Sequence, residues 1–139
     1  MKALIFAAGL GTRLKPITDT MPKALVPVGG KPLIEHVARK LKASGVDSAV
    51  VNVHHFAPKI VAWLSEYSSP ATSDSSNSPD MSGGGTGTRP LHVEISDESA
   101  MLLETGGAVL HARRFLEGCG HFLIHNVDIF SNADLGSLA

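Results

Sequence analysis

Unbroken apolar runs alternate along this chain with segments of helical periodicity. The runs at 2–7, 48–53 and 122–126 are rich in small and β-branched residues, which predicts buried strands. Apolar residues recur at three- and four-residue spacing over 31–44 and 58–67, which predicts helices that pack on those strands. Strands alternating with helices favour an α/β fold, a doubly wound, Rossmann-like and mostly parallel sheet with helices on both faces.

The rest of the pattern is less regular. The segment 91–95 alternates apolar and polar residues, which indicates a strand near a sheet edge. A helix is expected to open within 102–107 and to run to about residue 115. Ser131 or Asn132 is expected to cap a further helix that has barely started at the last residue.

Length and composition predict one globular domain over 1–139. Within it, 68–90 is rich in Ser, Gly and Pro and lacks periodicity, so it is expected to be a mobile surface insertion. We find no signal peptide and no apolar run near the ~20 residues that a membrane span needs. Cys119 is the single cysteine and can form no internal disulfide. These features predict a cytoplasmic protein without a membrane partner.

Charge is unevenly distributed along the chain. Residues 1–42 hold eight Lys and Arg against two Asp and Glu, whereas the chain as a whole has a net charge of −1. The basic residues are scattered and aromatic residues make up only 5%, which is untypical of a nucleic-acid surface. A phosphate-rich small ligand fits this basic third better.

A glycine-containing turn follows the first strand. Gly9 and Gly11 let a ligand approach the main chain, and Arg13 and Lys23 add positive charge beside the backbone amides. Amides with Arg and Lys suit a polyphosphate, whose charge is spread over several oxygens. The turn is neither a dinucleotide fingerprint, because Leu14 stands where a third glycine is needed, nor an ATPase phosphate loop, because it lacks G-K-[ST].

The predicted strand order places this turn close to a second polar position, the residue that follows the fourth strand. The first and fourth strands would lie side by side at the switch point of the sheet, where ligands bind beyond the carboxyl ends of strands. Asp128 follows the fourth strand and would face the turn across one cleft. A carboxylate there could anchor Mg²⁺, which usually takes few protein ligands, or could serve as an ordinary capping or turn aspartate.

The segment 104–107, Glu-Thr-Gly-Gly, lies where a helix is expected to open. Gly106 and Gly107 would leave room for a flat nucleobase beside the amides of the helix N-terminus. The alternative is a plain helix start capped by Thr105. His125 is expected to pack or to hydrogen-bond at the edge of the site, since no His or Cys cluster has metal-ligand spacing.

Together these motifs resemble the signature of the sugar-1-phosphate nucleotidyltransferases, the NDP-sugar pyrophosphorylases. The resemblance lies in G-L-G-T-R-L-K-P-I-T and P-K-A-L-V-P-V near the N-terminus, L-E-T-G-G-A-V at 103–109, and Asp128. The chain looks most like bacterial uridylyl- and guanylyltransferases that act on N-acetylmuramate, mannose or heptose 1-phosphates. The resemblance implies a sugar 1-phosphate attacking the α-phosphorus of a nucleoside triphosphate, UTP or GTP, with release of pyrophosphate.

The resemblance also implies roles for individual residues. Arg13 and Lys23 would be catalytic, Arg13 by neutralising the leaving pyrophosphate and Lys23 by stabilising the transition state. Asp128 would hold Mg²⁺. The nucleotide would be bound by Ala8, Gly9, Gly11, Thr12, Arg13, Lys23, Gly106, Gly107 and Asn126.

Two departures from the family qualify these expectations. Val127 stands where the family usually has glycine, and its side chain is expected to narrow or retune the pocket. The family's catalytic domains are also longer, so we expect only the N-terminal, nucleotide-binding half of a transferase, with apolar surface that favours self-association. The alternatives are a non-catalytic nucleotide-binding or regulatory module, an inactive remnant, or a cytidylyltransferase acting on another alcohol phosphate.

Overall fold

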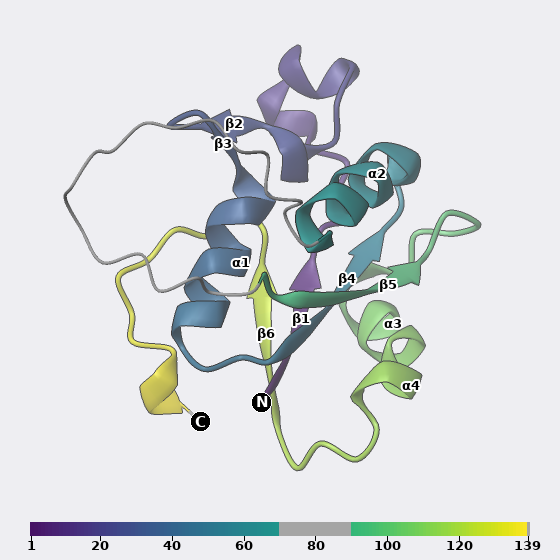
Figure 1. Cartoon of the computed structure of the whole chain (residues 1–139). Helices are drawn as coiled ribbons and strands as arrows, with labels where there is room; N and C mark the ends of the chain where they lie inside the picture. The colour runs from purple at the N-terminus through teal and green to yellow at the C-terminus, as the bar shows by residue number, and fades with distance from the viewer. Residues whose placement is uncertain (70–89, 139) are drawn as a thin grey trace, which may run out of the picture.

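A computed structural model describes residues 1–69 and 90–138 (Figure 1). In this part of the chain, one parallel sheet has the strand order β5-β4-β1-β6. Its strands are β1 (Lys2–Phe6), β4 (Ser48–Val53), β5 (His92–Asp97) and β6 (Phe122–Asn126). The helices are α1 (Leu33–Ala43), α2 (Ala57–Ser68), α3 (Glu104–His111) and α4 (Arg113–Leu116). The predicted insertion at 68–90 lies outside the described residues except at its ends.

The two central strands, β1 and β4, are covered on both faces. Ile5 and Val51 face a core built with α1 and α2, whereas Leu4 and Val50 face a smaller cluster built with α3 and α4. Figure 1 shows these two pairs of helices on opposite sides of the sheet. Burial on both faces explains why these strands read as continuous apolar runs. The predicted doubly wound, mostly parallel α/β fold is confirmed.

Short elements connect β1 to α1. The 3₁₀ turns Thr12–Leu14, Ile17–Asp19 and Lys23–Leu25 lead into a two-stranded ribbon of β2 (Pro27–Val28) and β3 (Lys31–Pro32). Gly29 and Gly30 join its strands with φ of 57° and 79°, and positive φ at both positions is typical of a tight hairpin turn.

The fourth strand differs from the prediction. β6 pairs with β1 as expected, with Leu4 opposite Ile124, but it lies at the edge of the described sheet and the Ile124 side chain is 50% exposed. An apolar run in the sequence cannot say whether both faces will be covered, so the prediction of a buried strand was wrong for β6. The prediction that 91–95 lies near an edge is confirmed, because β5 forms the opposite edge.

Two predicted helices also need correction. The helix expected up to residue 115 is divided at Ala112, which is buried against the sheet and accepts a hydrogen bond from Phe115 N at 3.0 Å. This short i to i+3 bond tightens the chain and separates α3 from α4. After β6, the only helical segment in the described residues is the 3₁₀ turn Gly136–Leu138. Neither Ser131 nor Asn132 caps a helix, because none begins next to them; Ser131 Oγ accepts from Ala133 N at 3.4 Å and from Lys40 Nζ at 3.0 Å.

No helix in residues 1–69 and 90–138 is long and apolar enough to cross a lipid bilayer.

Candidate functional site

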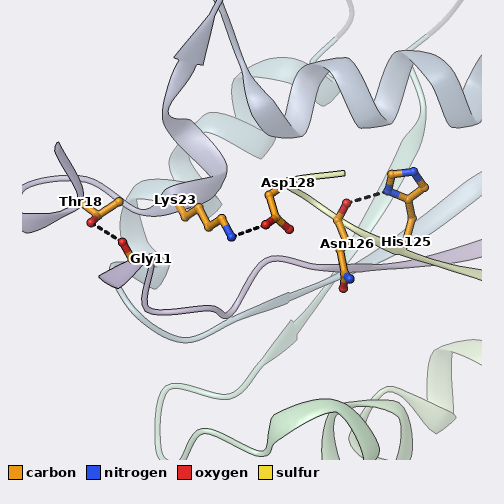
Figure 2. A network of polar contacts seen from close by, with 6 residues as sticks. All are labelled: Gly11, Thr18, Lys23, His125, Asn126 and Asp128. Atoms are coloured by element: carbon orange, nitrogen blue, oxygen red, sulfur yellow. Dashed lines mark hydrogen bonds and ion pairs between the residues drawn. The ribbon is translucent and has the colours of Figure 1, made fainter. Parts of the chain in front are cut away.

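The turn after β1 has a shape that only glycine fits easily at residue 11. Gly11 has φ of 66°, and its carbonyl oxygen accepts from Leu14 N at 2.9 Å and from Thr18 Oγ1 at 2.7 Å (Figure 2). A Cβ added at Gly11 would lie 2.8 Å from Thr18 Cγ2 and 3.2 Å from Lys23 Cβ. The left-handed backbone and the close packing together fix the turn beside Lys23.

The structure brings together most of the predicted phosphate-binding residues. Gly11, Thr12, Arg13 and Lys23 line one hollow next to this turn. Arg13 lies on the first and Lys23 on the third of the three 3₁₀ turns that follow β1, so two cations from separate short elements meet at one place. This arrangement can bind an anion whose charge is spread over several oxygens.

Lys23 and Asp128 form an ion pair across this site (Figure 2). Lys23 Nζ donates to Asp128 Oδ2, although the two residues lie 105 positions apart in the sequence. The hydrogen bond from Lys23 lowers the pKa of the Asp128 carboxyl below its usual value, and this effect exceeds the opposing effect of burial. The carboxylate is therefore ionised, as a ligand for a hard cation must be.

A second cavity, of about 210 Å³, lies at the carboxyl ends of β1, β4 and β6. Two of the predicted nucleotide-binding positions on the turn, Ala8 and Gly9, line it together with the predicted Asn126 of β6. The segment that opens α3 supplies further lining residues on another side of the cavity. The full lining is Phe6, Ala8, Gly9, Asn52, Glu98, Leu102, Glu104, Thr105 and Asn126.

Gly106 and Gly107 follow directly after Thr105 in the first turn of α3, and neither is among the residues that line this cavity. Glu104 and Thr105 line the cavity itself, and Thr105 makes no capping hydrogen bond in the described structure. A Cβ at Gly107 would lie 2.9 Å from Leu103 Cβ, so Gly107 allows α3 to pack closely on the residue before it. The role of these glycines toward a nucleobase stays a prediction.

The residues around Asp128 differ in orientation. Val127 is buried in the core on the α1 side, and its N–H donates to Phe6 O at 3.1 Å. Its side chain is absent from the lining of the two hollows described above, so the expected narrowing of the pocket was wrong. His125 is half-buried, and among the hydrogen bonds of the described residues its Nδ1 contacts only the neighbouring Asn126 carbonyl oxygen, at 2.7 Å (Figure 2).

Sequence reading missed Asn52 and Glu98. Both side chains are 3% exposed and line the second cavity, and Asn52 Nδ2 donates to Glu98 Oε1 at 3.1 Å. Glu98 Oε2 is buried without a hydrogen-bond partner among the described residues. The available signal was Asn52 itself, a lone polar residue inside an otherwise apolar strand, because a buried amide needs partners.

A parallel sheet with a loop of glycine and cations at the carboxyl end of its first strand is an arrangement that many nucleotide-binding α/β proteins share. The comparison with known families is more specific: the chain matches the Nucleotidyl transferase family over residues 2–139 and belongs to it. This confirms the family resemblance read from the motifs.

Individual relatives show how much of such a protein the chain represents. It is 41% identical over 126 residues to N-acetylmuramate alpha-1-phosphate uridylyltransferase of Caulobacter vibrioides, covering 91% of this chain and 45% of that protein. It is 32% identical to probable mannose-1-phosphate guanylyltransferase 2 of Arabidopsis thaliana, covering 97% and 33%. Among solved structures, HddC from Yersinia pseudotuberculosis is 25% identical with a TM-score of 0.74, covering 99% and 52%. The chain thus spans about half or less of each of these relatives.

Proposed function

We propose that this chain binds a nucleoside triphosphate and takes part in its transfer to a sugar 1-phosphate, giving an NDP-sugar and pyrophosphate. The observation that carries the proposal is the meeting of Gly11, Arg13 and Lys23 in one hollow, with Asp128 in contact with Lys23. This set supplies backbone amides, two cations and one carboxylate to a triphosphate. Such catalysis depends on positioning and electrostatic stabilisation rather than on a protein nucleophile.

The proposed roles follow the charges. Arg13 and Lys23 would hold the triphosphate and neutralise the negative charge that develops on the leaving pyrophosphate. Asn126, at the end of β6, would contact the bound substrates from the neighbouring strand. Removal of either cation is expected to lower the rate of transfer by ~10²-fold or more.

Mg²⁺ is the proposed metal, with Asp128 as its protein ligand. The described residues hold no group of three or more His, Cys, Asp or Glu that could enclose a metal ion. One carboxylate beside a phosphate-binding loop fits Mg²⁺, which is commonly held by one or two carboxylates together with substrate phosphates. Bound Mg²⁺ would supply charge neutralisation at the phosphates.

The nucleobase would occupy the second cavity. Glu98 lines this cavity and carries the buried oxygen without a partner, so a base that offers an N–H would satisfy it. Uracil and guanine present a ring N–H beside a carbonyl, and cytosine presents an amino N–H beside an acceptor ring nitrogen, so this oxygen accepts from any of the three. We propose UTP or GTP because the relatives at 41% and 32% identity are named as a uridylyltransferase and a guanylyltransferase, which places the cytidylyltransferase alternative second.

Calorimetric titration of the chain with UTP, GTP and CTP, with and without Mg²⁺, tests the binding. The proposal expects saturable, Mg²⁺-enhanced binding of UTP or GTP that Lys23→Ala removes. If none of these nucleotides binds to the folded chain, the proposal fails and the inactive-remnant alternative stands.

Pyrophosphate release with sugar 1-phosphates then separates an enzyme from a non-catalytic nucleotide-binding module. Nucleotide binding without pyrophosphate release would support the binding module for this polypeptide.

Self-association also stays a proposal. Ile124 on the edge strand and Leu110 on α3 are exposed apolar side chains, and both would be covered by a second surface. A molar mass from light scattering that equals one chain at all concentrations would contradict it.

A further inference from the structure

The first backbone N–H groups of the phosphate-binding turn, those of Ala7 and Ala8, are hydrogen-bonded to a side chain instead of to a neighbouring strand. β1 ends at Phe6, whose register partner on β4 is Asn52, and the chain then leaves the sheet. Asn52 Oδ1 accepts from Ala7 N at 2.7 Å and from Ala8 N at 3.3 Å. Ala7 and Ala8 are buried, so a side chain rather than bulk water must satisfy these donors.

Glu98 and the turn amides together determine which way the Asn52 amide points. A carboxylate only accepts, and the Ala7 and Ala8 amides only donate, so Asn52 must direct its NH₂ to Glu98 and its oxygen to the turn. Glu98 is itself fixed through its backbone, because its N–H donates to Val53 O at 2.8 Å and its carbonyl oxygen contacts His54 Nδ1 at 2.7 Å. The orientation of Asn52 is therefore fixed on one side by the turn amides and on the other by Glu98, which lies outside the turn.

We propose that Asn52 and Glu98 are positioning residues that hold the phosphate-binding turn in its binding geometry. This inference rests on the proposed function, since it concerns the same turn. Asn52 acts through the amides of Ala7 and Ala8, and Glu98 acts through Asn52. Because all four residues are buried, bulk water cannot replace a hydrogen bond that is lost between them. The loss of one of these bonds therefore displaces the turn.

The test exploits the direction of each hydrogen bond. Asn52→Asp keeps an acceptor for the turn but removes the donor to Glu98 and places two carboxylates together in the interior. Glu98→Gln alone keeps an acceptor for Asn52. In the double variant, the new amide at position 98 can donate to the new carboxylate at position 52, which restores the connection to the turn. Asn132→Asp, an exposed position, makes the same chemical change elsewhere.

The affinity of each full-length variant for inorganic tripolyphosphate is measured by calorimetry, since this probe reports the turn without a base. Thermal unfolding of each variant confirms that it is folded at the temperature used. We expect Asn52→Asp to bind about tenfold more weakly, Glu98→Gln less than threefold more weakly, and the double variant to recover most of the loss. Asn132→Asp is expected to bind like the original chain.

Equal affinity of folded Asn52→Asp and the original chain would overturn the inference, and so would a double variant as weak as Asn52→Asp. If Asn52→Asp does not fold, Glu98→Met removes the same connection at similar volume and must weaken tripolyphosphate binding. An original chain that binds neither tripolyphosphate nor a nucleotide would overturn the proposed function as well. An original chain that binds both, with no response to these variants, would overturn this inference alone.

Discussion

Asp128→Asn is predicted to tighten the binding of a triphosphate when Mg²⁺ is absent. In the structure, the carboxylate of Asp128 engages the Lys23 ammonium, the cation proposed to bind phosphate. A triphosphate must therefore compete with Asp128 for Lys23 in the metal-free chain. The asparagine side chain has no charge, so it releases Lys23 and also removes repulsion between a carboxylate and the ligand.

The size of the effect follows from how exposed the pair is. The side chains of Lys23 and Asp128 are 25% and 43% exposed, so solvent screens their attraction and the pair contributes about 1 kcal/mol. Recovery of that free energy on binding corresponds to about fivefold tighter binding. Because the attraction is electrostatic, the gain should shrink as the salt concentration rises.

Titration calorimetry with UTP, first in a chelating buffer and then with Mg²⁺, measures the affinity for UTP without and with the metal. Asp128→Asn should bind UTP more tightly than the original chain without Mg²⁺, but its affinity should hardly change when Mg²⁺ is added. Glu117→Gln, at the exposed residue that follows α4, removes one negative charge away from the site and is the matched control. Weaker or unchanged Mg²⁺-free binding by Asp128→Asn would refute the competition between Asp128 and the triphosphate.

Three further predictions concern stability and can be measured by urea unfolding. Gly11→Ala should lower the free energy of unfolding by about 1–3 kcal/mol, because it combines positive φ with a 2.8 Å contact, whereas Gly9→Ala meets nothing within 4 Å in the described residues and should be nearly neutral. Ile5→Ala, at a fully buried position, should cost about 2–5 kcal/mol, and Ile124→Ala, half exposed, clearly less. Hydrogen bonds from the side chain and backbone of Ser99 lower the pKa of Asp97 below its usual value of 3.8. The contribution of Asp97 to the free energy of unfolding is therefore complete above pH 3.8 and is lost as the pH falls through the lowered pKa. Asp97→Asn should therefore show a flatter decline in stability below pH 3.8. Equal costs within either pair, or an unchanged acid decline for Asp97→Asn, would contradict these predictions.

Much of the fold could be predicted from local patterns in the sequence. Continuous apolar runs marked β1, β4 and β6, and the amphipathic spacing of 31–44 marked α1, because burial of one face or of both faces leaves a period in the sequence. The predicted adjacency of β1 and β6 also held, since helix-connected parallel strands allow few topologies. These inferences needed no knowledge of side-chain contacts between distant elements.

The predictions that were wrong concern features that depend on spatially neighbouring elements, which no local sequence pattern identifies. The exposure of β6 depends on what lies beyond it, and the break at Ala112 depends on how α3 and α4 meet the sheet. Val127 was expected in the pocket but faces the core, because the chain path after β6 fixes the direction of its side chain.

For the candidate site, the sequence by itself determined the turn chemistry: glycine at residue 11, the cations Arg13 and Lys23, and an acid after the fourth strand. These are local requirements of backbone geometry and charge, so they appear as a motif. Only the tertiary structure decided that Lys23 contacts Asp128 and that Asn52 connects the turn to Glu98. Such pairs depend on strand order and register, which bring together side chains that lie about 45 to 105 positions apart, beyond the reach of any periodicity.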